Sequence, residues 1–315
     1  MFTINLLRFF IFSLPRELHL IFFRISGFVL RRFKIEILVE TFFGAKISCE
    51  LWDDFDRSIA LFGVWEPTLS LLMFRSLKPG DVFVDVGANI GYFTSLASRL
   101  VTDFGHVHAF EPVPATLKKF KNHSEINYWR NVTIKGVALG AKPDLIKMNL
   151  GPEFSRAQAS AVYSFADSAI FEVASETMDS QIILEHCDKI RFIKIDVEGY
   201  EFDVCKGMVD ILSKLQPSAL VVIEIGYNEN EKFGSSGHEI QQLFLSLGFE
   251  MWLIPNDYRG ESYFGKNHVP APIKIDQIPP IHCDVLFCRA IDPEILGQWP
   301  EVTVSQLRSY WSKTH

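Results

Sequence analysis

Residues 80–94 read GDVFVDVGANIGYFT, and this stretch decides the fold. Residues 82–86 form an apolar, largely β-branched run that stops at Gly87. Residues 91–100 then carry apolar side chains at helical spacing. The pattern predicts a strand, a tight turn and a helix. This is the first β-α unit of a doubly wound α/β sheet.

An acid follows the next predicted strand. Residues 106–110 read HVHAF, a second short strand, and Glu111 stands at its C-terminal end. Doubly wound folds place an acid on a ribose diol about twenty residues beyond the glycine turn. Glu111 has this spacing from Gly91, so the sequence predicts a site for a nucleoside-containing cofactor.

The turn differs from that of a dinucleotide-binding protein. A dinucleotide turn reads Gly-x-Gly-x-x-Gly, but Asn89 and Tyr92 occupy its second and third glycine positions here. The Asp85 carboxylate and the Asn89 carboxamide can instead bind the ammonium and carboxylate groups of a ligand. This favours the amino-acid end of S-adenosylmethionine over a diphosphate. The alternative is a tight turn that binds nothing.

Three stretches together carry a family resemblance: KPGDVFVDVGANIG at 78–91, FEP at 110–112 and IKIDVEGYE at 193–201. With them the chain resembles the FkbM family of S-adenosylmethionine-dependent methyltransferases over roughly residues 60–290, and the third stretch is far more specific than a glycine turn. The resemblance implies a class I methyltransferase fold, a Rossmann-like seven-stranded sheet with helices on both faces and an antiparallel last strand.

The resemblance also implies S-adenosylmethionine as cofactor and methylation of a hydroxyl oxygen on a small-molecule, glycan or lipid-linked acceptor. It does not fix the acceptor. The residues expected to bind the cofactor lie in the turn and at the strand ends: Asp85, Gly87, Asn89, Gly91, Glu111, Pro112, Val137, Ala138 and Asp196.

Composition narrows the classes of partner. The chain has 315 residues, of which 48% are hydrophobic, so it can form one large α/β domain with appendages. Its net charge of -7 argues against nucleic-acid binding, which needs a basic face. Five scattered cysteines without Cys-x-x-Cys spacing predict reduced, buried thiols and a cytoplasmic location: Cys49, Cys187, Cys205, Cys283 and Cys288.

Residues 1–34 combine bulky apolar side chains with arginines. They contain no uncharged stretch of the roughly twenty residues that a spanning helix needs, and arginine interrupts each candidate signal-peptide core. Two interpretations remain open: peripheral contact with a membrane surface, or docking on the domain or in an oligomer. Beyond this segment we expect an extension at 35–79, the methyltransferase domain at 80–290 and a C-terminal tail at 291–315. The oligomeric state stays open.

The sequence predicts a hairpin and two helices before the third strand of the domain. Alternating apolar residues at 33–51 predict a hairpin, and proline at the start of 65–77 predicts a helix. A further helix is expected at 115–127, with Lys118, Lys119 and Lys121 on a solvated face.

The third strand is predicted at residues 132–137, so that Val137 and Ala138 border the adenine ring of the cofactor. Residues 141–180 are polar and irregular. They suit a lid or recognition loop, or an edge hairpin around residues 169–178.

The fourth and fifth parallel strands are predicted at 190–195 and 219–225. Asp196 ends the first of them and Glu224 ends the second. Ligands of open α/β sheets lie at the carboxyl ends of the strands near the switch in strand order, so Asp196 should face the site that contains Gly87.

The remaining chain completes the sheet. His238 opens an amphipathic helix, and residues 249–254 form a sixth strand. A proline-rich loop is expected at 255–280, and residues 284–288 form the last strand.

Oxygen methylation needs an acceptor hydroxyl in line with the sulfonium methyl and a group that takes its proton. Asp196 is the first candidate base, with Glu224 and His238 as second choices. Asp196 could equally bind the cofactor. A divalent metal on Asp196, Glu198, Glu224 and His238 is compatible with the sequence, but no tight ligand motif demands it, and no metal ligand is assigned.

Two other functions are compatible with this fold class. The first is an NAD-dependent oxidoreductase, which Asn89 and Tyr92 disfavour because they replace the expected glycines. The second is a membrane-associated scaffold that keeps the methyltransferase fold without turnover.

Overall fold

The computed structural model describes residues 32–149, 170–182, 184–226, 237–256 and 268–314, together with residues 18 and 263. Its centre is an eight-stranded sheet in the order β12-β11-β13-β10-β9-β3-β4-β5. In chain order these strands are β3 (Val82–Val86), β4 (His106–Phe110), β5 (Val132–Lys135), β9 (Ile190–Ile195), β10 (Leu220–Ile225), β11 (Glu250–Ile254), β12 (Ile273–Ile275) and β13 (Cys283–Cys288).

The direction of the strands confirms the predicted class I plan. Strands β5, β4, β3, β9 and β10 run parallel, and β13 lies antiparallel between β10 and β11. The predicted number of seven strands is wrong by one, because β12 pairs with β11 at the sheet edge. This strand lies inside the predicted loop 255–280. It is three residues long and mostly exposed, so hydrophobic periodicity in the sequence could not predict it.

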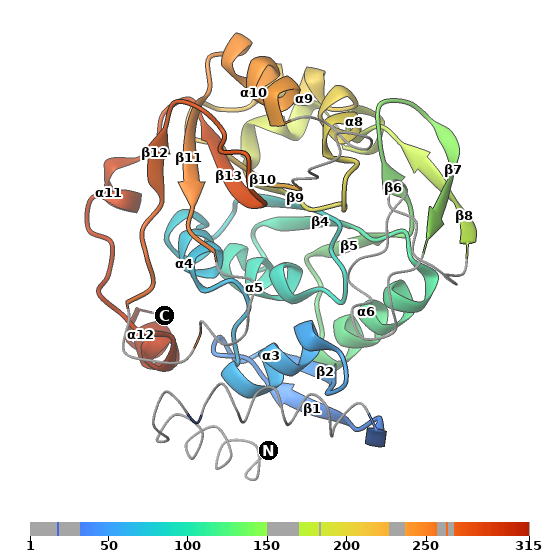
Figure 1. Ribbon diagram of the computed structural model, residues 1–315, viewed down its shortest axis with the longest axis vertical. Helices are drawn as coiled ribbons and strands as arrows, with labels where there is room; N and C mark the ends of the chain where they lie inside the picture. Colours follow the sequence, from blue (N-terminus) through green and yellow to red (C-terminus); the bar gives the residue numbers. More distant parts are fainter. Residues whose placement is uncertain are drawn as a thin grey trace.

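Helices cover both faces of the sheet (Figure 1). Helices α4 (Pro67–Ser76) and α5 (Tyr92–Val101) pack on one face, whereas α8 (Glu201–Lys206), α9 (Val209–Lys214) and α10 (Gly237–Ser246) pack on the other. Side chains along β3 alternate between the two cores, since Phe83 joins the first and Val84 the second. All of β3 is therefore buried, as its continuous apolar run predicts.

The predicted N-terminal hairpin is confirmed as β1 (Glu36–Glu40) and β2 (Lys46–Glu50). Helix α3 (Asp54–Phe62) follows it, capped by Asp53 and ended by Gly63, and the sequence did not predict this helix. The predicted helix at 65–77 begins two residues later, at Pro67 in α4.

The C-terminal segment shares a core with this extension. It contains α11 (Pro293–Leu296), the short 3-10 helix η4 (Val304–Gln306) and α12 (Leu307–Thr314). The Trp311 ring packs edge-on against Phe42, with ring centroids 5.8 Å apart, and lies 5.1 Å from Phe74 of α4. Arg308 donates hydrogen bonds to the carboxylate and backbone of Glu40. The predicted tail is thus part of the hydrophobic core on the α4 face.

Helix α6 (Pro114–Asn127) corrects the interpretation of its lysines. Lys118 and Lys121 are exposed as expected, but the Lys119 Nζ lies 2.5 Å from the Asp56 carboxylate of α3. Burial raises the pKa of Asp56 to about 6 against the opposing attraction of Lys119. This ion pair joins segments 63 residues apart in sequence, so no local pattern could reveal it.

The chain leaves the main sheet after Lys135. The third strand ends at Lys135, two residues earlier than predicted, and β6 (Ala138–Leu139) pairs with β8 (Ile170–Glu176). Strand β8 also pairs antiparallel with β7 (Asp144–Asn149), so residues 170–176 form an edge pairing in the region where a hairpin was expected. Residues 150–169 lie outside the described residues, and the lid or recognition loop stays a prediction. The short helix α7 (Met178–Gln181) and the 3-10 helix η2 (Leu184–Lys189) lead back to β9.

His123 of α6 connects three elements. It is fully buried, its Nδ1 hydrogen donates to the Ile90 carbonyl at 2.8 Å, and its Nε2 accepts the Ser48 amide hydrogen at 2.9 Å. Burial lowers the pKa of His123 to about 4, so the folded protein keeps this imidazole neutral.

We expect His123 to make folding stability depend on pH. An unfolded histidine binds a proton near pH 6.5, so its contribution to stability is full above that pH and falls as the pH drops toward 4. The total loss is about 3 kcal/mol, from about 1.4 kcal/mol per pKa unit, and about 2 kcal/mol of it falls between pH 7.5 and pH 5. Urea unfolding at pH 7.5 and pH 5 measures it. His123→Gln keeps a donor and an acceptor without titrating, so an equal loss in both proteins would contradict the prediction.

The five cysteines are buried thiols, as the sequence predicts. Within the described ranges, no helix combines the length and apolarity needed to cross a membrane. Most of residues 1–34 lies outside the described residues, so the two interpretations of that segment stay predictions.

Candidate functional site

The turn after β3 lies against the turn after β9. Gly87 has a φ of +77°, and a Cβ built on it would stand 1.7 Å from the backbone carbonyl oxygen of Asp196. Gly91 has a φ of +86°, and its Cβ would stand 2.1 Å from the Phe120 ring. Both positions therefore exclude any side chain, and Gly87 sets the close approach of the two turns.

Glu111 holds the turn from the neighbouring strand β4. Its Oε2 accepts the Asn89 amide hydrogen at 2.8 Å, and its Oε1 accepts that of Val113 at 2.8 Å. Burial raises the pKa of Glu111 to about 7, although both hydrogen bonds act in the opposite direction. Asn89 has a φ of +51°, which aims its amide at this carboxylate. Each carboxylate oxygen retains a second lone pair for a ligand hydroxyl.

Asp85 lies in β3, two residues before Gly87, and is fully buried. Its Oδ2 accepts the Thr94 hydroxyl hydrogen at 2.6 Å, whereas its Oδ1 has no hydrogen-bond partner among the described residues. Burial raises the pKa of Asp85, which the ammonium of Lys194 partly offsets. An acceptor without a partner at this depth is a candidate for a cationic ligand group.

The other expected cofactor residues lie along the β4 and β5 side. Pro112 directly follows Glu111, and Ala138 is buried with Val113 and Met148. Val137 is partly buried against the core on the α8 face. These positions border the same strand edge, but none of the three side chains offers a polar group.

Asp196 stands at the carboxyl end of β9 beside a buried lysine. The Lys194 Nζ lies 2.7 Å from its Oδ2 and 5.0 Å from the centroid of the Phe93 ring. Burial acts to raise the pKa of Asp196, but the Lys194 ammonium outweighs it and holds the pKa below its usual range. Asp196 is therefore an ionised carboxylate at the sheet edge, and part of its side chain is exposed.

Glu224 ends the next strand and shares a hydrogen bond with Asp196. Burial and the Asp196 charge raise the pKa of Glu224 well above its usual value, so the shared proton belongs to Glu224. The Nε2 of His282 lies 2.6 Å from Glu224 Oε1. His238 does not join this group, because it is exposed on α10 and its Nε2 bonds Gln242 of the same helix.

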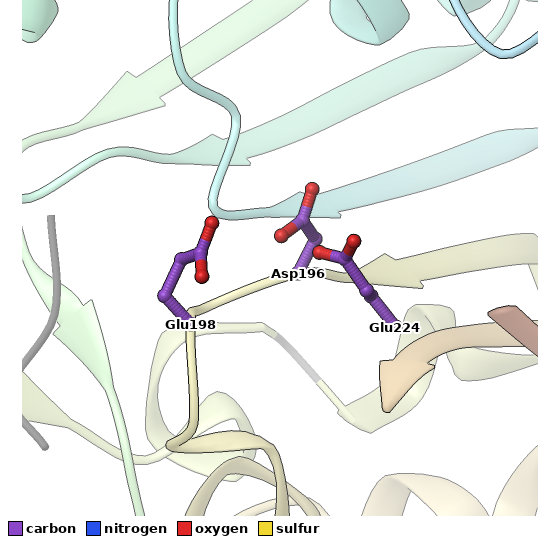
Figure 2. A group of neighbouring side chains, drawn as sticks. All are labelled: Asp196, Glu198 and Glu224. Atoms are coloured by element: carbon purple, nitrogen blue, oxygen red, sulfur yellow. The ribbon is translucent and has the colours of Figure 1, made fainter. Parts of the chain in front are cut away.

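Glu198 completes a group of three carboxylates. It follows β9 with a φ of +54°, and its carboxyl group points toward those of Asp196 and Glu224 (Figure 2). One oxygen of each residue lies within 4.8 Å of the others, so the three could hold a metal ion. Burial and the nearby charges of Asp196 and Glu201 raise the pKa of Glu198 to about 8.

The sequence analysis missed two residues of this site. His282 immediately precedes β13, and the register Glu224↔Asp284 brings it to the end of β10. The expected antiparallel last strand already implied that its start lies at the carboxyl edge, so this signal was present. Glu66, before Pro67 of α4, is buried and acts electrostatically on Lys194 and Asp196, and nothing in its sequence pattern indicated this.

Comparison with known proteins gives relatives of modest similarity. The chain is 26% identical over 151 residues to Methyltransferase 1 of Beauveria bassiana, covering 42% of this chain and 60% of that protein. It is 25% identical over 154 residues to the hexuronic acid methyltransferase AglP of Haloferax volcanii, covering 49% and 59%. The chain thus spans about 60% of the length of these relatives.

A solved structure, that of methyltransferase FkbM from Methylobacillus flagellatus KT, is 14% identical. The match covers 83% of this chain and 58% of that one, with a TM-score of 0.41. The model of the methyltransferase FkbM domain matches residues 85–251, just over half of the chain, from the Asp85 turn to β11. The chain therefore belongs to the FkbM family of S-adenosylmethionine-dependent methyltransferases.

Proposed function

We propose that the protein transfers the methyl group of S-adenosylmethionine to a hydroxyl oxygen of a sugar, glycolipid or secondary metabolite, with Asp196 as the proton acceptor. The observation that carries the proposal is the ionised Asp196 carboxylate, 2.7 Å from Lys194 and in contact with the Gly87 turn through its backbone. A base must stand beside the cofactor turn to serve methyl transfer, and Asp196 meets this requirement.

The residues fit the cofactor at both of its ends. Glu111 offers acceptor lone pairs for the ribose hydroxyls, and the buried Asp85 Oδ1 offers an acceptor for the ammonium group. Gly87 and Gly91 let the turn pack closely against the Asp196 backbone and the Phe120 ring, which fixes its position between these two ends. The cofactor supplies an electrophilic methyl group on a sulfonium. Val137, Ala138 and Pro112 stay proposed neighbours of the adenine ring.

In the proposed reaction the acceptor oxygen attacks the methyl carbon and the carbon–sulfur bond breaks. The hydroxyl proton passes to the Asp196 carboxylate. Lys194 keeps Asp196 ionised, and the protonated Glu224 donates a hydrogen bond to it, so these two residues orient the base rather than compete with it. His282 borders Glu224 on its partly exposed side.

The acceptor class rests on the family and on one relative. AglP of Haloferax volcanii is named as a hexuronic acid methyltransferase, which supports a sugar hydroxyl as acceptor here. The cofactor half of the site is independent of this choice and is tested first.

We expect Glu111→Ala to weaken S-adenosylhomocysteine binding at least about tenfold, equivalent to about 1.4 kcal/mol. Hydrogen bonds to a charged carboxylate contribute about 1.5 to 3 kcal/mol each, so losing the ribose contacts should exceed this threshold. Isothermal titration calorimetry measures the affinity. Glu125→Gln removes an exposed acid of α6 and is the matched control. Unchanged affinity in a folded Glu111→Ala protein would remove Glu111 from the site.

The same titration separates the rival functions. The methyltransferase predicts binding of S-adenosylhomocysteine, an oxidoreductase predicts binding of NAD, and a scaffold without turnover binds neither. A wild-type protein that binds NAD and not S-adenosylhomocysteine would overturn the proposal.

A further inference from the structure

We propose that Asp196, Glu198 and Glu224 bind an oxygen-preferring divalent cation at the carboxyl edge of the sheet. This inference deepens the proposed function, because the ion would stand where the acceptor hydroxyl must lie. It rests on the spacing of the three carboxylates and on a fourth buried acidic residue, Glu66, which interacts electrostatically with Asp196.

The spacing of the ligand atoms suits such an ion. One oxygen from each of the three residues lies within 4.8 Å of the other two. Oxygen ligands lie about 2.3–2.6 Å from Ca²⁺ and about 2.0–2.1 Å from Mg²⁺, so ligands on opposite sides of an ion are about 5 Å or about 4 Å apart. The site therefore accepts an ion of calcium size directly and a magnesium-sized ion after small rotations of the side chains.

Glu66 supplies the independent observation. It is 3% exposed, and its Oε2 has no hydrogen-bond partner in the part of the chain that the structure describes. Its charge acts on Asp284, Lys194 and Asp196, so this carboxylate belongs to the same cluster. The buried Oε2 of Glu66 therefore keeps an unused acceptor position close to Asp196 and Lys194.

Several acidic groups share this buried site. Asp196 is paired with the Lys194 ammonium, 2.7 Å away, and the charge of Asp196 acts on Glu66, Glu198 and Glu224. Several carboxylates in a poorly solvated site need protons or a cation to balance them. A divalent cation provides two charges and leaves coordination positions for the oxygens of an acceptor, which would draw the hydroxyl toward Asp196.

Binding of Mn²⁺ at fixed pH tests the proposal without any acceptor. We expect calorimetry and Mn²⁺ electron paramagnetic resonance to show one ion per wild-type chain. Glu198→Gln and Glu224→Gln should each weaken binding at least tenfold. Asp203→Asn is the matched control, since this nearby acid of α8 pairs with Lys206 on the surface. The Mn²⁺ affinity of this variant should stay within twofold of that of the wild type. Competition by Ca²⁺ and Mg²⁺ then ranks the ions.

Two results would overturn the proposal: no Mn²⁺ binding by the wild type up to about 10 mM, beyond the weak end of protein calcium sites, or equal binding by all four proteins. Circular dichroism and S-adenosylhomocysteine affinity show whether each variant is folded. A wild type that binds S-adenosylhomocysteine but no Mn²⁺ refutes the ion and leaves the methyltransferase standing. A wild type that binds Mn²⁺ but no S-adenosylhomocysteine supports the ion site and refutes the proposed methyltransferase function.

Discussion

Asp196→Asn is expected to lower the rate of methyl transfer by about two to four orders of magnitude, the usual contribution of a general base. Asparagine keeps the shape of the side chain and one carbonyl oxygen, but it has no basicity. The measurement is a single-turnover rate at saturating S-adenosylmethionine, with labelled methyl groups and a sugar or glycolipid fraction that the wild type methylates. Cofactor affinity should change far less.

The neighbouring carboxyl group provides the comparison. Glu224→Gln preserves a hydrogen-bond donor toward Asp196, as the protonated Glu224 does, so at a saturating concentration of divalent cation its rate should fall much less than that of Asp196→Asn. A near-normal saturated rate for Asp196→Asn with a raised dissociation constant would reassign Asp196 to cofactor binding. A collapse confined to Glu224→Gln would transfer the role of base to Glu224.

Gly87→Ala is expected to destabilise the protein by about 3 kcal/mol or more and to remove S-adenosylhomocysteine binding. The new Cβ would stand 1.7 Å from the carbonyl oxygen of Asp196, so the turns after β3 and β9 would have to separate. Overpacking of this kind typically costs about 1–3 kcal/mol, and the positive φ adds about 1 kcal/mol. Urea unfolding and calorimetry measure the two effects.

Gly80→Ala is the matched control for Gly87→Ala. Gly80 also has a positive φ, +95°, but its Cβ would have no atom within 4 Å. This variant carries the backbone strain without the collision, and we expect a loss of about 1 kcal/mol with normal ligand binding. If the two variants are equally stable, the close approach of the turns does not limit the fold.

Local patterns were sufficient for the centre of the fold. The buried run of β3 and the glycine turn are properties of adjacent residues, and so is the acid at the end of β4. Their positions follow from strand and helix periodicity alone. Local patterns failed for Lys119. Its helix face was predicted to be solvated, but its ammonium is bound to Asp56 of α3. Which partner a long side chain finds depends on how distant segments pack, and periodicity does not encode this.

Local patterns likewise predicted some residues of the candidate site and not others. Asp196 and Glu224 could be predicted from the sequence because they lie at the ends of predicted parallel strands. Asp196 directly follows β9, and Glu224 pairs with Asp284 of β13. His238 lies outside this cluster, since it is exposed at the start of α10 and bonds Gln242, and its role as a base stays a prediction. His282 lies beside Glu224 because β13, which it precedes, pairs antiparallel with β10. This pairing joins distant parts of the sequence.

The contact between Arg308 and Glu40 joins residues 268 positions apart, and Trp311 packs on Phe42 of the hairpin turn. On the ribosome, the hairpin therefore emerges long before the aromatic side chain that covers it. Strand β13 likewise fits between β10 and β11 only after both have been made. Phe42 must wait for Trp311 through most of synthesis, whereas β10 waits for β13 only while the last part of the domain is made. During these intervals exposed apolar surface makes the nascent chain prone to association.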